Sequence, residues 1–249
     1  RFKIPGTLRR GTESGDIQFF RCNECDYKAN VEKANSLADL VQAIYPCPPM
    51  EVIDTPGLKT VDDLVNGLPK LGYNVPASKM IKTILYQTSE RDNPFVAAEV
   101  IGDDEINEVK LANAIGCSEV SPAGHRVVEE VTGAPVGFAG PINLPLEVRL
   151  YIDERAINTR DVLFGINQED KHAIHADPRR DIPHPYSVVN IRTAREGDGC
   201  VSCQSGTLHK QKGVELGHIF QLGTVYSVPM NATFTDMDGK QKPFVMGCY

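Results

Sequence analysis

Four cysteines in two matching pairs constrain this chain most. They stand in Cys22-Asn-Glu-Cys25 and Cys200-Val-Ser-Cys203, with the 174 residues from 26 to 199 between the pairs. Two thiolates separated by two residues can bind a zinc ion from a single turn, and two such turns complete its tetrahedral shell. Zinc ribbons usually place their two pairs about 15–20 residues apart. The spacing therefore predicts a zinc site at the base of a domain inserted into another.

Two other interpretations of the cysteines remain open. They could be ordinary reduced cysteines in turns, or a single pair could be a redox site. Both pairs lie among polar residues typical of turns, which favours the metal. The chain has seven cysteines, an odd number, with four in metal-like spacing, so we expect a reducing compartment, by default the cytoplasm, and no disulfide scaffold.

Size and charge exclude several classes of protein. At 249 residues the chain suits one large domain or two modest ones. The sequence contains no apolar run of about 18 residues, so no membrane span is predicted. The net charge is −7, so no overall basic field attracts nucleic acid. An RNA substrate would have to be bound locally, or by parts of the protein outside this chain.

Helix and strand patterns follow one another without strict alternation. Strands are expected at 50–53, 80–87, 94–101, 146–153, 162–167 and 188–192, and those at 80–87 and 94–101 as neighbours in one sheet. Helices are expected at 29–34, 37–43, after Thr60 as a cap, near Pro76, at 103–114 and at 125–131. Asp236-Met-Asp-Gly239 predicts a hairpin that belongs to an antiparallel sheet. The order indicates an α+β or mixed α/β insert.

Long strings at both ends resemble the bacterial type of prolyl-tRNA synthetase, a class II enzyme. They are CNECDYKANVEKA from Cys22, VELGHIFQLGTVYS from Val214 and MNATFTDMDGKQKPFVMGCY from Met230. Between the cysteine pairs, KTIL, INEVKL, TGAPVGFAGPINL, YID and GINQEDKH are similar to the YbaK-like editing domain inserted in that family. The resemblance implies a class II antiparallel-sheet part at 1–25, the inserted editing domain at 26–199, and a return to the class II sheet at 200–249.

The resemblance also implies that this chain is a fragment. In the family, the first two class II motifs precede this region, and a glycine-rich segment with an ATP-binding arginine follows it. We therefore expect no activation of proline by this chain alone.

The function implied by the resemblance has two parts. The inserted domain would hydrolyse alanine wrongly attached to proline-specific tRNA, because a proline pocket cannot strongly exclude a smaller amino acid. The flanking parts would belong to the ATP- and Mg-dependent charging site of a proline–tRNA ligase. The implied partners are the acceptor end of that tRNA, proline and ATP, with a homodimer through the class II core and no membrane.

Candidate residues for ester hydrolysis follow from the same resemblance. The family's editing lysine corresponds to Lys82, although a lysine in an apolar strand is otherwise expected on the solvent face. The loop that contains Gly133, Gly137 and Gly140 can present backbone N–H groups to a developing oxyanion, or it is a plain connection.

Two further residues complete the predicted editing site. His172 is expected to shape or polarise the pocket, with His175 and His184 as competitors. Asp153 could pair with the substrate's α-ammonium group, or equally cap the next turn. No catalytic triad is predicted, and Cys117 has no base beside it.

The synthetase part contributes four predicted binding residues. Glu215, His218, Phe220 and Thr224 occupy a string that lines the proline and adenylate pocket in the family. Two rival functions remain: a non-catalytic, zinc-clamped tRNA-binding module, and a free-standing deacylase.

Overall fold

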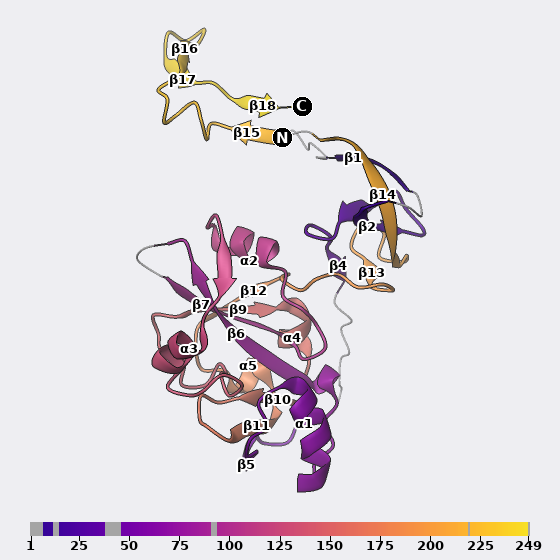
Figure 1. Cartoon of the computed structure of the whole chain (residues 1–249), viewed down its shortest axis with the longest axis vertical. Helices are drawn as coiled ribbons and strands as arrows, with labels where there is room; N and C mark the ends of the chain where they lie inside the picture. The colour runs from indigo at the N-terminus through magenta and orange to yellow at the C-terminus, as the bar shows by residue number, and fades with distance from the viewer. Residues whose placement is uncertain (1–6, 12–14, 38–45, 91–93, 219, 249) are drawn as a thin grey trace. The chain divides into compact units, whose positions relative to one another are not determined.

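The computed structural model describes residues 7–11, 15–37, 46–90, 94–218 and 220–248 (Figure 1). The chain divides into two compact units. One consists of Arg1–Arg21 and Lys210–Tyr249, and the other of Cys22–His209. Within the described residues, no helix is long and apolar enough to cross a membrane.

The larger unit is built on a mixed eight-stranded sheet. Its main path runs β12-β9-β7-β6-β10-β11-β5, with β8 paired to β6. The strands are β5 (Glu51–Asp54), β6 (Met80–Thr88), β7 (Phe95–Ile101), β8 (Val120–Pro122), β9 (Arg149–Asp153), β10 (Val162–Gly165), β11 (Lys171–Ala176) and β12 (Tyr186–Val189). The predicted mixed α/β architecture of this region is confirmed.

β6 and β7 are neighbours in one sheet, as predicted, and they pair antiparallel at its centre. Both strands are apolar runs because both faces of the sheet are covered. On one face Ile81 and Leu85 pack with Ala97, and on the other Tyr86 packs with Ala98. The core of the unit therefore has two layers around these strands.

Helices cover both layers. They are α1 (Val61–Gly67), η1 (Leu68–Leu71), η2 (Ala77–Lys79), α2 (Glu108–Ile115), α3 (His125–Thr132), α4 (Glu154–Asn158) and α5 (Pro178–Asp181). The α3 and α4 helices pack on the face of Ile81, and α2 packs on the face of Tyr86. The predicted cap at Thr60 is confirmed: its hydroxyl accepts from the Asp63 backbone, and the Asp63 carboxylate accepts from the Thr60 backbone.

Two predicted helices need correction. Residues 29–34 are not helical, because β3 (Lys28–Asn30) is extended and a turn follows in which Ala34 N donates to Asn30 O at 2.9 Å. The helix predicted at 103–114 begins only at Glu108, since the Asn107 side chain caps it there. The helix predicted at 37–43 falls mostly on residues 38–45, which lie outside the described part of the chain.

Three strand pairs of the smaller unit are antiparallel. β14 (Leu208–His218) lies between β1 (Thr7–Gly11) and β2 (Ile17–Cys22) in its sheet. β15 (Phe220–Gly223) pairs with β18 (Met246–Cys248), and β16 (Thr233–Thr235) with β17 (Gln241–Pro243). The turn between β16 and β17 is the predicted Asp-Gly hairpin, with Gly239 at a φ of 73°.

Candidate functional site

A cleft opens in the larger unit where β6 extends beyond its pairing with β10. β10 pairs with β6 only through Leu163 opposite Met80 and Phe164 opposite Ile81, whereas β6 continues to Thr88. The cleft has a volume of about 520 Å³. Its lining comes from the start of α1, the turn after β7, the end of β10 and the loop after α3.

Three of the predicted editing residues line this cleft together. They are Lys82 on β6, Gly137 in the loop after α3, and His172 on β11. The order of strands in the sheet explains why Lys82 and His172 lie near each other, since β10 lies between β6 and β11.

The three glycines of the loop have different roles. Gly137 has a φ of 106°, and a Cβ there would lie 2.7 Å from the Lys59 backbone, so only glycine lets the loop approach. Gly140 is buried, and its Cβ would lie 1.5 Å from the Gly165 carbonyl oxygen. Gly133 ends α3 in the left-handed conformation and is exposed. The structure thus brings Gly137 into the cleft and leaves Gly133 outside its lining.

Asn167 fixes this loop and is not among the predicted site residues. Its side-chain amide donates to the Gly140 and Ile142 carbonyl oxygens at 2.9 and 2.7 Å, and its oxygen accepts from Gly140 N at 2.9 Å. Asn167 itself has a φ of 57°, a conformation that asparagine tolerates better than most residues. The signal in the sequence is an asparagine two residues after the end of β10, within the range 162–167 that is expected to be a strand.

His172 is buried and held from two sides. Its Nδ1 lies 2.7 Å from the Thr55 hydroxyl, and its ring centroid lies 5.6 Å from that of Phe138. Burial lowers the pKa of His172 from 6.5 to about 4, against the opposing effect of a hydrogen bond to the Gly137 backbone. The imidazole is therefore neutral at physiological pH and positions the Gly137 loop.

Lys82 is less exposed than a lysine on a solvent-facing strand. Its side chain is 22% exposed, and Nζ lies 2.9 Å from the carboxylate of Glu105, which also lines the cleft. Glu105 is itself 77% exposed, so this ion pair is open to solvent and weak. A substrate group can therefore compete for the ammonium at little cost.

The next residue on β6, Thr83, connects the cleft to a buried acid. Thr83 lines the cleft, and its hydroxyl donates to Glu99 Oε1 on β7 at 2.7 Å. Glu99 is fully buried, and burial raises its pKa to about 7.

Asp153 lies outside the cleft lining. Its side chain caps α4 by accepting from Arg155 N at 2.9 Å, and it accepts from Ile191 N and Arg192 N at 2.9 and 3.1 Å. These bonds favour the capping interpretation over contact with a substrate ammonium group. His175, in turn, pairs with Asp161 at 2.8 Å and is also absent from the lining.

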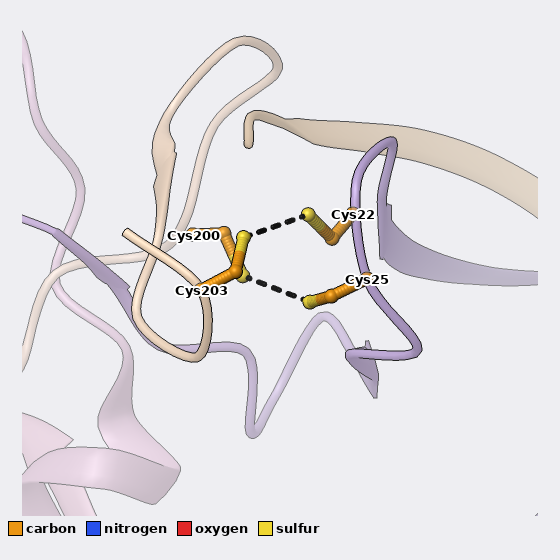
Figure 2. Close-up of side chains that lie close together, drawn as sticks. All are labelled: Cys22, Cys25, Cys200 and Cys203. Carbon is orange, nitrogen blue, oxygen red and sulfur yellow. Dashed lines mark hydrogen bonds between the residues drawn. The ribbon is translucent and has the colours of Figure 1, made fainter. Parts of the chain in front are cut away.

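The four paired cysteines meet in the larger unit (Figure 2). Their sulfur atoms all lie within 4.8 Å of one another, with Cys22 and Cys203 at 3.6 Å and Cys25 and Cys200 at 3.7 Å. Four thiolates at about 2.3 Å around a tetrahedral ion would be about 3.8 Å apart. All four are free of disulfides. The cluster therefore fits a tetrahedral metal ion.

Backbone contacts support this cluster. Glu24 N and Gly206 N donate to the sulfurs of Cys22 and Cys203, both at 3.3 Å, and a Cβ on Gly206 would lie 2.4 Å from the Cys22 sulfur. Such N–H···S bonds stabilise thiolates, the form that binds metal.

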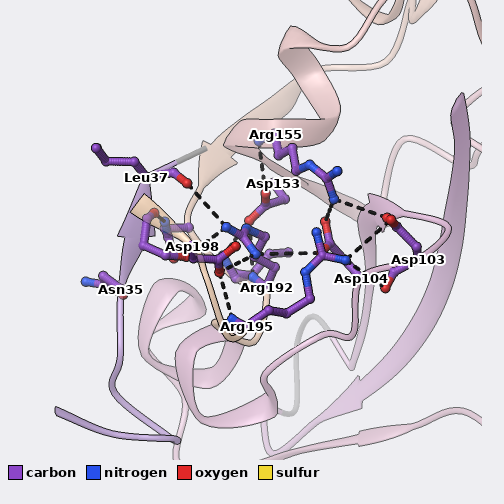
Figure 3. Close-up of polar contacts among 12 residues, drawn as sticks. Asn35, Leu37, Asp103, Asp104, Asp153, Arg155, Arg192, Arg195 and Asp198 are labelled. Carbon is purple, nitrogen blue, oxygen red and sulfur yellow. Dashed lines mark hydrogen bonds and ion pairs between the residues drawn. The ribbon is translucent and has the colours of Figure 1, made fainter. Parts of the chain in front are cut away.

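A buried ion cluster surrounds Arg192 in the larger unit (Figure 3). Arg192 is 2% exposed and lies 2.8 Å from Asp198 and 3.6 Å from Asp104. It also donates to the Ser36 hydroxyl at 2.8 Å. Ser36 is in β4 (Ser36–Leu37), which pairs with β13 (Gly199–Cys200), and Ser36 lies opposite Cys200 of the cysteine cluster.

The same ion cluster continues to the cleft. Asp103, which lines the cleft, accepts from Arg155 at 3.1 Å and pairs with Arg195 at 3.3 Å. The backbone carbonyl of Glu105 accepts from Thr193 N at 2.7 Å. The turn after β7 is thus held by the segment that leads to the second cysteine pair.

The four predicted residues of the synthetase part lie in the smaller unit. Glu215 and His218 are in β14, Phe220 begins β15, and Thr224 follows it. Phe220 is 50% exposed, and the Thr224 carbonyl accepts from the Ser227 hydroxyl at 3.4 Å. Their proposed role in binding stays a prediction.

Comparison with known proteins identifies relatives for most of the chain. Residues 55–180 match the family described as Aminoacyl-tRNA editing domain. A proline–tRNA ligase from Desulforamulus reducens is 40% identical over 239 residues, 95% of this chain and 40% of that protein. One from Solidesulfovibrio magneticus is 41% identical over 95% of this chain and 39% of its own length. The chain therefore spans about two fifths of these relatives.

A solved structure of the hypothetical protein APE2540 is also similar. It is 23% identical with a TM-score of 0.49, and the match covers 57% of this chain and 91% of that one.

Arg192→Met tests the buried ion cluster. Removing the guanidinium leaves Asp198 buried without its cation, whereas Asp104 keeps Arg155 and Arg195. Because a buried carboxylate loses its partner, we expect a loss of about 3–5 kcal/mol in the free energy of unfolding. Urea denaturation followed by far-UV circular dichroism measures this loss. The control Arg126→Met removes an ion pair whose arginine is 90% exposed and should cost less than about 0.5 kcal/mol. Equal effects would contradict the cluster's importance.

The pKa of His172 is a second test. We expect NMR titration of the folded protein to give a pKa of about 4, against 6.5 in urea. Because the folded-state pKa is the lower one, His172 contributes stability that is complete above pH 6.5 and lost as the pH falls toward about 4. A folded-state value near 6.5 would contradict the buried, neutral ring.

Proposed function

Because this chain belongs to the aminoacyl-tRNA editing domain family, we propose that its cleft hydrolyses alanine wrongly attached to proline-specific tRNA. One observation carries this proposal: Lys82, Gly137 and His172, far apart in the sequence, line the same cleft. In the reaction, water adds to the ester carbonyl and the bond to the ribose oxygen breaks. The products are alanine and a tRNA with a free terminal hydroxyl.

Each of these residues has a distinct part in the proposed hydrolysis. The Lys82 ammonium leaves its exposed partner Glu105 and binds the ester carbonyl or a terminal phosphate of the tRNA. The loop at Gly137 directs backbone N–H groups at the developing oxyanion, where fixed donors are most effective. Neutral His172 holds that loop through the Gly137 backbone and does not act as a cation.

The proposed substrate is small because the cleft would accept alanine and reject the larger proline. A synthetase pocket for proline separates alanine by only about 1–3 kcal/mol, since the two differ by few methylene groups. Val61 and Leu64 of α1, together with Met80, give one side of the cleft an apolar wall. Such a wall accepts a methyl side chain and limits a larger ring.

We also propose that the four-cysteine cluster holds zinc as a structural ion. Its sulfur-only donor set and tetrahedral spacing fit zinc, and a closed four-ligand shell leaves no position for a substrate. The ion would fix the two ends of the larger unit to each other, and it takes no part in hydrolysis.

The proposed role of the smaller unit follows from the relatives named proline–tRNA ligase. We propose that it belongs to the class II sheet of a longer, dimeric enzyme that charges tRNA with proline using ATP and Mg²⁺. Glu215, His218, Phe220 and Thr224 would then line the proline and adenylate pocket. This chain spans about two fifths of those relatives, so charging requires the remainder.

Release of alanine tests the editing proposal. With purified proline-specific tRNA carrying alanine, we expect rapid release of alanine, and slow release of proline from the matching control. Lys82→Ala should lower kcat/KM at least about tenfold, because it removes a charge that contacts the reacting ester. The control Lys70→Ala, in exposed η1, should be neutral. Bound but unhydrolysed tRNA would support the binding-module alternative instead.

Metal analysis tests the zinc proposal. We expect one zinc ion per chain by mass spectrometry, and its loss in Cys25→Ser with a lower unfolding temperature for the larger unit. Cys117→Ser should retain the ion, because Cys117 lies outside the cluster. Full retention of zinc in Cys25→Ser would rule out this site.

A further inference from the structure

Glu99 is a buried acid that the proposed hydrolysis does not use. It lies on the central strand β7 with 0% of its surface exposed. Its Oε1 accepts from Thr83, and its Oε2 has no hydrogen-bond partner among the residues that the structure describes. Burying a carboxylate without a cation is costly, and such groups are uncommon unless they have a role.

The hydroxyl of Thr83 has a fixed direction because of this acid. A threonine hydroxyl has one proton to donate and two lone pairs that accept. When Glu99 is ionised it can only accept, so the Thr83 proton is committed to it at 2.7 Å. Thr83 Oγ1 can then only accept a further hydrogen bond, through its lone pairs. Thr83 is partly exposed and lines the cleft, so its hydroxyl oxygen can accept a hydrogen bond from a group in the cleft.

A cation in the cleft would complete this arrangement. Thr83 would accept a hydrogen bond from it, and the negative charge of Glu99 behind the hydroxyl would strengthen that bond. The cationic side chain beside Thr83 on the strand, Lys82, pairs with Glu105 instead. An aminoacyl ester carries a suitable cation, the α-ammonium group, close to its reacting carbonyl.

We propose that Thr83, backed by Glu99, is the subsite that binds the α-ammonium group of the esterified amino acid. This inference rests on the proposed editing function and adds to it the determinant that selects an amino acid over a hydroxy acid. Thr83 contacts the substrate, and Glu99 is a positioning residue that acts through the Thr83 hydroxyl.

Binding of non-hydrolysable analogues tests the subsite without requiring catalysis. The probes are adenosine with alanine, or with lactic acid, joined to the 3′ position as an amide. They differ by an ammonium group in place of a hydroxyl. We expect the protein to bind the alanyl probe about tenfold more tightly at about pH 7, measured by NMR titration, as for a hydrogen bond to a charged group.

Variants of the pair should abolish this preference selectively. Glu99→Gln keeps the shape of the side chain but removes its charge, and Thr83→Val removes the hydroxyl. Both should weaken the alanyl probe about tenfold and leave the lactyl probe within about twofold. Thr83→Ser should restore the preference. Glu129→Gln, which changes the same charge on exposed α3, is the control and should have no effect.

The outcomes separate the two proposals. Equal weakening of both probes would mean a purely structural role, and an unchanged preference in Glu99→Gln would mean no role, so either result overturns the subsite. Absence of any preference in the unaltered protein also overturns it. Selective binding without hydrolysis of alanyl-tRNA would instead refute the editing function and keep the subsite. In deacylation, the variants should raise KM for the alanyl ester more than they lower kcat.

Discussion

The close contact between two glycines, Gly140 and Gly165, determines the shape of the candidate site. No side chain fits between them, since a Cβ on Gly140 would lie 1.5 Å from the Gly165 carbonyl oxygen. Because the loop after α3 lies directly on the end of β10, it reaches the open side of β6. Asn167 then fixes it with three hydrogen bonds. The cleft thus depends on backbone packing, and its functional side chains sit on rigid strands around it.

Two ionisable side chains of the cleft are neutral or paired in the absence of a substrate. His172 is neutral because it is buried, and Lys82 is held by Glu105. Glu99 is sequestered behind Thr83. The turn that carries Asp103 and Glu105 is in turn anchored to the buried ion cluster of Arg192. Side chains held in this way need little reorganisation when a ligand binds, which is the condition for effective electrostatic stabilisation.

Much of this fold could be predicted from local sequence. The apolar runs gave β6 and β7, the Asp-Gly pair gave the hairpin, and the cysteine spacing predicted a cluster that the structure brings together. Lys82 and His172 were predicted through family resemblance rather than by their surroundings. The helix predicted at 29–34 was wrong because tertiary contacts decide there: these residues have helix-compatible composition but form a strand and a turn. For Asp153 the contacts favour capping, one of the two expected roles, because it accepts from the backbone N–H groups of Arg155, Ile191 and Arg192. The contacts of Asn167 and Glu99 could not be found from the sequence, because they depend on segments that are distant along the chain.

The hydrogen bonds between Asn23 and Thr207 have an evolutionary consequence. These residues are 184 positions apart, yet Thr207 N donates to the Asn23 side chain at 2.8 Å and Asn23 N donates to the Thr207 carbonyl at 3.1 Å. The larger unit therefore starts and finishes at one point in space. Because its two ends lie together, the whole unit could be inserted into a host protein, or deleted from it, with little displacement of the host's own strands. Insertion or removal of a unit whose two ends meet therefore needs no redesign of either part.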